Sequence, residues 1–284
     1  MLGACTIAVG SPHYYRMAFV NAATFKKYNP KIPIVLITDT TGIVGIYKED
    51  IKVFDDVIRI KPESYEISGR PEPQTIKFQL AELTPFEETI FTDADTINFG
   101  SIDKTLVKLS NRDLTFMQHG YYDFSTGSRN AKCGFWGNIE EIKKYYNITT
   151  GKLPAISSTF IHFKKTQLNK TIFQEAADLF SKDAPCHKWA ETLPDEFFFN
   201  VALHLNNYDT HWVQFYPVFS HWFCTEGTEL EIKAKYPMLT TGGNKVPKFV
   251  KGIYDREVAK ITTHYPSRFY HRDKKDILTE RTLI

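Results

Sequence analysis

The most informative segment of this sequence is Thr89-Ile90-Phe91-Thr92-Asp93-Ala94-Asp95-Thr96. Its first four residues favour a β-strand, and the two aspartates follow them directly. Alternate residues of an extended chain point to the same side, so the carboxylates of Asp93 and Asp95 can converge on one cation. Carboxylate oxygens prefer hard ions such as Mg²⁺ or Mn²⁺. The stretch predicts a buried strand with a metal site at its carboxyl end; a plain polar turn is the competing interpretation.

The residues before this strand alternate between strand and helix patterns. Apolar spacing predicts strands at Cys5–Val9, Ile34–Ile37 and Val57–Ile60, and helices at 12–28 and 74–84. Such alternation favours an α/β fold in which helices cover both faces of a parallel sheet. Ligands of these sheets bind beyond the carboxyl ends of the strands. We therefore expect Gly10, Asp39 and the two aspartates along one edge.

The second half of the chain is less regular. It predicts strands at 113–117, 158–163 and 259–264, helices at 139–146, 168–181 and 195–205, and long loops at 120–133 and 236–255. The sequence contains no internal repeat and no clear linker, so we expect one domain over residues 1–284.

Composition places the chain among soluble globular proteins. It has 284 residues, of which 42% are hydrophobic and 24% charged. The net charge of +2 points to neither nucleic acid nor membrane, and no apolar run approaches the roughly 18 residues that span a bilayer. From Lys245 onward, lysines and arginines outnumber acids and give this tail about +5. The tail is either a phosphate-binding segment or a solvated surface.

Several common types of site are excluded by their missing motifs. The four cysteines, Cys5, Cys133, Cys186 and Cys224, have no CxxC spacing, which argues against a zinc knuckle and against a disulfide framework. The first strand is followed by neither GxGxxG nor a Walker loop, and no GxSxG elbow occurs. Residues 1–10 do not form a signal peptide. We expect a cytoplasmic protein with reduced cysteines.

The DxD stretch resembles that of retaining GT-A glycosyltransferases of the glycogenin and lipopolysaccharide galactosyltransferase kind. The opening Thr6–Gly10 with Tyr14-Tyr15, and Thr75–Leu80 before the DxD strand, are similar to that family as well. The resemblance implies a mixed Rossmann-like sheet, with residues 1–100 binding the nucleotide sugar and 101–284 the acceptor. It also assigns residues to the donor: Ala8, Val9, Tyr15 and Ala94 beside the nucleotide, and Lys77 near the diphosphate.

Two later segments extend the resemblance. Asp195-Glu196-Phe197-Phe198-Phe199-Asn200 is similar to the family's Asp-Gln-x-x-x-Asn motif, which implies that Asp195 and Glu196 meet the transferred sugar. Glu196 replaces the Gln, and a helix N-terminus that favours acids explains the same residues without a catalytic role. Residues 261–268 resemble the family's histidine element, which implies that His264 is the third metal ligand. That element's lysine and Pro-Trp are missing, and Arg268, His271 and Arg272 are the candidates for the lost positive charge.

The resemblance implies transfer of a sugar from a UDP-sugar, with Mn²⁺ or Mg²⁺ and with retention of configuration. Ser157–Ile161 occupies the place of the family's Asn-x-Gly-Val strand with both characteristic residues changed, so the acceptor is left open. A saccharide is expected from the family, and a hydroxymethylated DNA base is a second option suggested by the basic tail. A nucleotidyltransferase and a non-catalytic sugar-binding module are the alternatives from other classes.

Overall fold

In a computed structural model of the chain, the described residues are 1–39, 51–131, 134–181, 183–188, 192–208, 217–220, 228–241 and 248–264. The side chains of residues 262–264 lie outside the description. No helix among the described residues is long and apolar enough to cross a bilayer.

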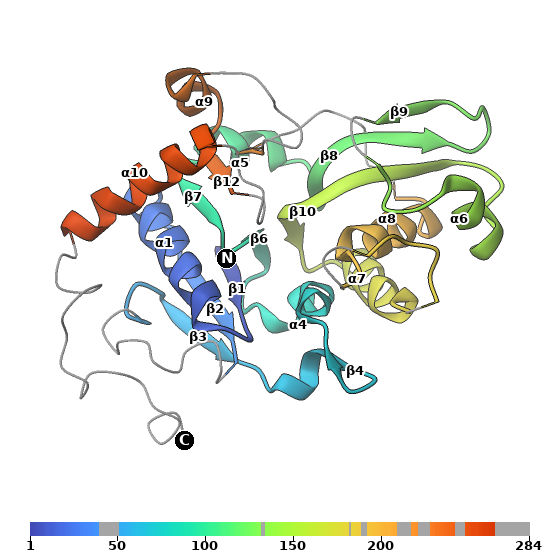
Figure 1. The fold of residues 1–284 in the computed structure, drawn as a ribbon, viewed down its shortest axis with the longest axis horizontal. Coiled ribbons are helices and arrows are strands. Elements are labelled where there is room, and N and C mark those ends of the chain that lie inside the picture. The colour runs from blue at the N-terminus through green and yellow to red at the C-terminus, as the bar shows by residue number, and fades with distance from the viewer. Residues whose placement is uncertain are drawn as a thin grey trace.

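A seven-stranded mixed sheet forms the centre of the molecule (Figure 1). Its strands, in spatial order, are β3 (Asp56–Arg59), β2 (Ile34–Thr38), β1 (Leu2–Ala8), β6 (Glu88–Thr92), β10 (Lys152–Lys164), β8 (Leu114–Asp123) and β9 (Arg129–Ala131). The first four are parallel, and from β6 onward each neighbouring pair is antiparallel. The predicted α/β sheet is confirmed, with an antiparallel half added to it.

Helices cover both faces of this sheet, as predicted. One face carries α1 (Pro12–Tyr28) and α10 (Lys248–His264), and the other carries η2 (Pro73–Gln79), α4 (Leu80–Leu83), α7 (Gln167–Leu179) and α8 (Asp195–Leu205). The remaining helices are η1 (Pro62–Tyr65), α5 (Asp103–Leu109), α6 (Ile139–Tyr145) and α9 (Glu229–Lys235). Two small sheets complete the fold: β4 (Glu66–Ile67) with β5 (Arg70–Pro71), and β11 (Val218–Phe219), β12 (Met238–Thr240) and β7 (Thr96–Asn98).

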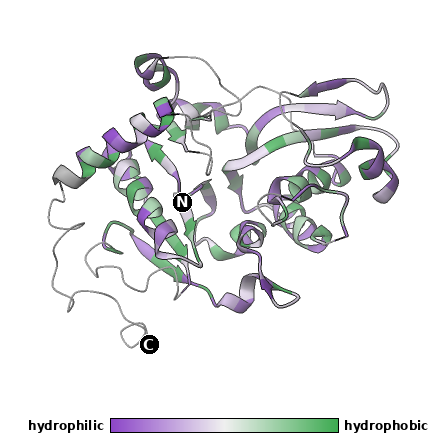
Figure 2. Cartoon of the chain, viewed as in Figure 1, coloured by the Kyte–Doolittle hydropathy of each residue, from purple (hydrophilic) through white to green (hydrophobic). Residues whose placement is uncertain are grey.

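The strands divide their apolar side chains between two core clusters. In β2, Ile34 and Leu36 pack toward α1, while Val35 and Ile37 pack toward the opposite helix layer. This is the period-two alternation of a strand that is buried on both faces. Burying one such side chain stabilises the fold by about 1.5–3 kcal/mol. Figure 2 shows the contrast with the edge strand β9, whose sequence Arg-Asn-Ala is mostly hydrophilic.

The predicted strand at 259–264 is wrong, because these residues end helix α10. Val250, Ile253, Glu257 and Ile261 are all buried, and their spacing of three or four residues is helical. The short stretch 259–264 does not contain enough of this pattern to distinguish a helix from a strand. The predicted helix at 74–84 begins as the 3-10 helix η2 and becomes α-helical only at α4.

The two predicted long loops are also largely wrong. β8 runs on to Asp123 and forms an antiparallel pair with β9, so residues 120–133 contain a hairpin. Residues 236–255 contain β12 and the first turns of α10. Polar composition suggested loops in both segments. β9 and β12 are strands because their backbones pair with neighbouring strands, and composition does not reveal such pairing.

A buried amide network ties α1 to the strand that carries the aspartates. Asn21, fully buried, donates from Nδ2 to the Thr92 hydroxyl at 2.9 Å and to the Asp93 carbonyl at 3.0 Å. The Asn98 amide donates in turn to Asn21 Oδ1 at 3.1 Å. These bonds fix the backbone at the carboxyl end of β6, where the site lies.

We expect Asn21→Ala to lower the free energy of unfolding by about 2 kcal/mol, because it removes the buried hydrogen bonds that the Asn21 side chain makes with Thr92, Asp93 and Asn98. Urea denaturation measures the change. Asn111→Ala, at an exposed position, is the control and should leave the midpoint unchanged. Equal stability of the Asn21 and Asn111 variants would contradict the role given to this network.

Candidate active site

The two aspartates predicted to bind a metal line one cavity of about 600 Å³ at the carboxyl end of β6. The Asp93 N–H donates to the Thr159 carbonyl of β10 at 3.0 Å, and the Thr96 N–H donates to the Asp93 carbonyl at 3.0 Å. The chain therefore turns between β6 and β7. This turn presents both carboxylates to the cavity.

Asp95 is oriented by the strand beside β7. The hydroxyls of Thr240 and Thr241 donate to its two carboxylate oxygens at 2.9 and 3.0 Å. Hydroxyl donors hold a carboxylate in place without neutralising its charge. Asp95 therefore keeps its capacity to bind a cation.

Lys77 joins the aspartates to the start of α8. Its Nζ lies 2.9 Å from Asp93 Oδ1 and 3.3 Å from Asp195 Oδ2, and it donates to the Ser158 hydroxyl at 2.9 Å. The ammonium also lies over the Phe91 ring, 5.4 Å from its centroid. Segments far apart in the sequence thus meet at one cation, and the contact of Lys77 with a diphosphate stays a prediction.

The cavity carries more negative than positive charge. Four acidic side chains line it: Asp93, Asp95, Asp195 and Glu196. Among the described lining residues, Lys77 is the one side chain that is either a lysine or an arginine. Burial raises the pKa of Asp93 to about 6; Lys77 opposes this rise and Asp95 adds to it. Burial lowers the pKa of Lys77, but Asp195 and Asp93 outweigh this and hold it above its ordinary value. A further cation would relieve the excess charge.

The acids of this cavity have the charge and the donor atoms that a metal ion requires. Asp93 and Asp95 supply hard oxygen donors, and the Lys77 ammonium beside Asp93 already stands in for a cation. Within the described part of the chain, no three His, Cys, Asp or Glu side chains form a complete metal site. His264 ends α10, and its side chain, like all of Arg268, lies outside the described residues. The two aspartates therefore fit two positions of a divalent-cation site.

The acids at the start of α8 differ in their contacts. Asp195 faces Lys77. Glu196 instead accepts the Ser158 N–H on Oε1 at 3.1 Å and the Trp136 indole N–H on Oε2 at 2.6 Å. Burial and the neighbouring Asp195 raise the pKa of Glu196 to about 7, against the opposing charge of Lys77.

The residues predicted beside the nucleotide are not among those that line this cavity, although Ala94 lies between Asp93 and Asp95. Ala8, Val9 and Ala94 are buried at the carboxyl edge of the parallel strands, and none is among the described lining residues. Tyr15 is 1% exposed and packs edge-on against Phe54 in the core. Their contact with a nucleotide stays a prediction.

The edge itself is organised as expected. Asp39 follows β2, is fully buried, and accepts the Gly10 N–H on its two oxygens at 3.3 and 3.2 Å. Gly10 has a φ of +73°, which favours glycine. This bond links the ends of β1 and β2.

Several cavity residues were not identified from the sequence. Trp136 and His119 come from the antiparallel half, and His187 and Thr192 come from the segment before α8. Gly134-Phe135-Trp136-Gly137 is a signal that could have indicated Trp136, because an aromatic residue between glycines is typical of a shaped loop.

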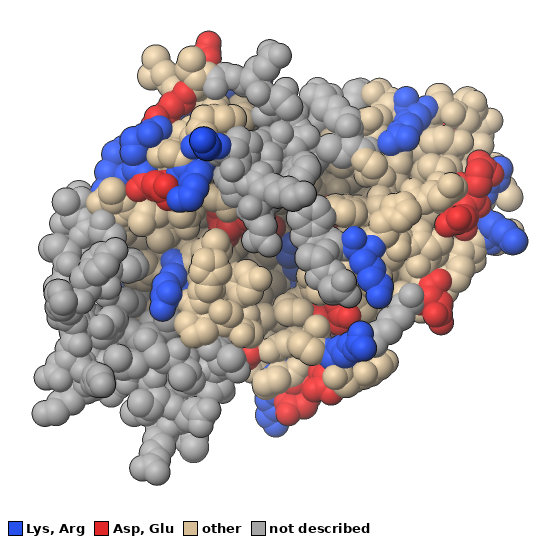
Figure 3. Space-filling view, in the orientation of Figure 1, with Lys and Arg blue, Asp and Glu red and all other residues tan. Residues whose placement is uncertain are grey.

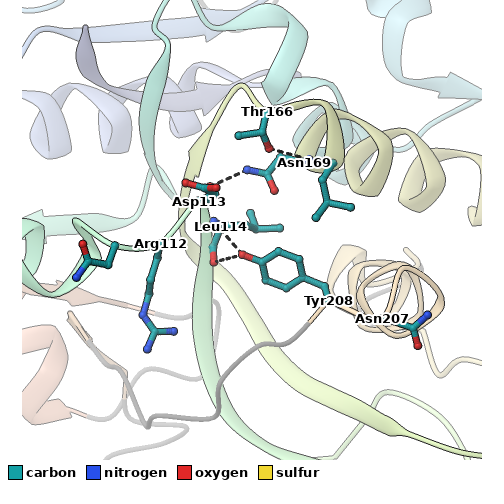
Figure 4. A pocket seen from close by; sticks show the side chains of 9 residues that line it. Arg112, Asp113, Leu114, Thr166, Asn169, Asn207 and Tyr208 are labelled. Atoms are coloured by element: carbon teal, nitrogen blue, oxygen red, sulfur yellow. Dashed lines mark hydrogen bonds between the residues drawn. The ribbon is translucent and has the colours of Figure 1, made fainter.

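A second cavity, of about 410 Å³, lies beside α7 and the end of α8 (Figure 4). Its polar groups hold elements together: the Tyr208 hydroxyl donates to the Leu114 carbonyl at 3.0 Å and accepts its N–H at 3.1 Å. The Asn169 amide donates to the Asp113 carbonyl at 2.7 Å. These are structural contacts, and the cavity that holds Asp93 is the stronger candidate for catalysis.

Among solved structures, the chain is similar to several glycosyltransferases. The galactosyltransferase LgtC, in complex with donor and acceptor sugar analogues, has a TM-score of 0.56 and 10% identity over 95% of this chain and 98% of that one. The bifunctional glycosyltransferase WbbM has a TM-score of 0.55 and 12% identity over 95% of this chain, which spans 52% of WbbM. The glycosyltransferase GlyE of Streptococcus pneumoniae has a TM-score of 0.53 and 13% identity over 94% of this chain and 64% of GlyE.

These likenesses show that the chain has the GT-A fold, as the sequence predicted. No protein-family model and no curated protein matches the sequence.

The raised pKa of Glu196 predicts a pH-dependent stability. The folded protein binds more protons at Glu196 than the unfolded chain between about pH 4.5 and 7, so this residue's contribution to the free energy of unfolding falls as pH rises through that range. In Glu196→Gln this contribution is absent, and the variant should gain stability relative to wild type as pH rises. Urea midpoints across that range measure the difference, with Glu82→Gln as an exposed control. A constant difference between variant and wild type would contradict the assignment.

Proposed function

We propose that this chain is a metal-dependent glycosyltransferase that takes its sugar from a nucleotide sugar, most simply a UDP-sugar. One observation carries the proposal: Asp93, Asp95, Lys77 and Asp195 converge in a single cavity at the carboxyl edge of a GT-A sheet. Ligands of open α/β sheets bind at this edge, where the strand order or direction changes. Here β10 runs antiparallel to β6 at that point.

The donor diphosphate is proposed to lie between the aspartates and Lys77. Asp93 and Asp95, with His264 as a third candidate ligand, would hold Mn²⁺ or Mg²⁺. When bound, the ion supplies a Lewis acid that neutralises charge on the leaving nucleotide. Lys77 lies close enough to Asp93 to share this task, and its retained positive charge suits a diphosphate.

The nucleoside is proposed to lie toward the ends of β1 and β2. Ala8, Val9, Tyr15 and Ala94 remain the candidates for this part of the site, and Arg268 remains a candidate for a phosphate contact. The Gly10–Asp39 bond supports the proposal, since it shapes the edge beside the metal site.

Asp195 is proposed to act on the transferred sugar. Its carboxylate, beside Lys77 in the cavity, can bind sugar hydroxyls and stabilise positive charge at the anomeric carbon. In the reaction the bond from this carbon to the diphosphate breaks and a bond to the acceptor oxygen forms. The acceptor proton passes to the leaving phosphate, which is consistent with transfer by retention and requires no separate base.

A saccharide is the proposed acceptor. On the face drawn in Figure 3, basic and acidic side chains of the described residues are interspersed, and this face gives the DNA alternative no support. A nucleotidyltransferase would release pyrophosphate from a nucleoside triphosphate, and a sugar-binding module would turn over no donor. Both alternatives are distinguished by assaying the nucleotide product.

Calorimetric titration with UDP and a panel of UDP-sugars tests the donor site. We expect binding that requires Mn²⁺ and falls at least about tenfold in Asp95→Asn, because the variant removes a charged ligand. Asp178→Asn, exposed on α7, is the matched control. Failure of UDP, UDP-sugars and other nucleotide sugars to bind would remove the central proposal.

Substitution of Lys77 tests the chemistry. We expect Lys77→Met to lower kcat by about 100-fold or more, because the developing diphosphate charge loses an oriented cation. Lys77→Arg should retain part of the rate. Lys26→Met, in a partly exposed ion pair away from the cavity, is the control. An unchanged kcat in Lys77→Met would contradict the proposed position of the diphosphate.

A further inference from the structure

The loop between β9 and α6 holds a tryptophan in an unusual backbone conformation. Trp136 has a φ of +60°, in the left-handed region that bulky residues rarely adopt. The other described non-glycine residues with positive φ are a serine and two asparagines, Ser68, Asn147 and Asn207. Such conformations persist where the surroundings impose them, and they concentrate at functional sites.

Residues on both sides of Trp136 fix this loop. Phe135 is 2% exposed and packs edge-on against Tyr122. Gly137 approaches other parts of the chain so closely that a Cβ would lie 2.3 Å from the Pro185 carbonyl oxygen. The His187 N–H donates to the Trp136 carbonyl. The backbone therefore has little freedom to move the indole out of the cavity.

The indole itself is held by Glu196. Its N–H donates to Glu196 Oε2 at 2.6 Å, and Glu196 Oε1 accepts the Ser158 N–H at 3.1 Å. Ser158 also accepts a hydrogen bond from Lys77. Both oxygens of Glu196 are thus engaged in orienting protein groups, in contrast to Asp195, whose carboxylate faces Lys77.

We propose that Trp136 is the surface on which the acceptor sugar ring packs, and that Glu196 is a positioning residue that holds the indole in place. This inference rests on the proposed function and names its acceptor class. Trp136 is half-buried in the cavity wall. A chain of polar contacts through Glu196, Ser158 and Lys77 connects it to Asp93. The indole N–H donates to Glu196, so the proposed contact is made by the flat ring, to which the C–H face of a pyranose is complementary.

The acceptor ring is neutral. Carboxylates outnumber cations among the described lining residues of the cavity, so an acceptor that carries its own carboxylate would be repelled. A neutral hexoside therefore fits where the corresponding uronide does not.

The test follows the indole N–H resonances of the protein bound to Mg²⁺ and UDP, since Mg²⁺ is diamagnetic and leaves these resonances observable, while methyl glycosides are added. The resonance missing from Trp136→Phe identifies Trp136, and Glu196→Gln should shift it. We expect methyl β-galactoside or methyl β-glucoside to perturb this resonance, and methyl β-glucuronide to leave it unchanged.

Substitutions complete the test. Trp136→Ala should raise the dissociation constant of the neutral glycoside by about tenfold and leave that of UDP within about twofold. Trp136→Phe keeps an aromatic ring without the N–H and should bind more weakly than wild type but better than Trp136→Ala. Tyr145→Ala, exposed on α6, is the control. Urea denaturation confirms that each variant is folded, and Trp136→Phe serves alone if the alanine variant does not fold.

Two outcomes would overturn the inference while leaving the proposed function intact: UDP binds but no neutral glycoside perturbs Trp136, or Trp136→Ala weakens UDP binding as much as glycoside binding. Absence of nucleotide binding in the wild type would instead remove the proposed function.

Discussion

The ion pairs of Lys77 with Asp93 and Asp195 are the interaction on which the cavity depends. They join η2, the end of β6 and the start of α8 at one point. Buried carboxylates destabilise a fold unless they are paired, so this lysine permits the two acids to face each other. It does not neutralise all the acids of the cavity, and the remaining negative charge is what makes a divalent cation a good fit. The same residue thus serves stability and the proposed chemistry.

The geometry around Lys77 comes from a change of strand direction. β6 is parallel to β1, whereas β10 is antiparallel to β6, so the end of one strand faces the middle of the other. The pairing of β10 with β8 is irregular between Ser157 and Ile161. Such irregularities redirect side chains. Here the Ser158 hydroxyl accepts a hydrogen bond from Lys77, and the Ser158 N–H donates to Glu196. The end of β6 therefore contributes Asp93 and Asp95, and the antiparallel strand β10 contributes Ser158, which contacts both Lys77 and Glu196.

Much of the parallel half could be predicted because its signals are local. β1, β2 and β6 are apolar runs whose ends are marked by polar or glycine residues, and Asp93 and Asp95 follow the last of them directly. α10 could not be predicted from residues 259–264, since its buried face extends back to Val250. β9 was missed because it is short, polar and defined by its pairing with β8.

That two carboxylates follow a buried strand of an α/β sheet could be inferred without the structure, because strand period and residue spacing are properties of a continuous segment. The tertiary structure decided which distant groups meet them. Thr240 and Thr241 orient Asp95, Lys77 pairs with Asp93, and Trp136 is held by Glu196. None of these pairs is local in the chain, and each exists only because the packed sheet brings its members within hydrogen-bond distance.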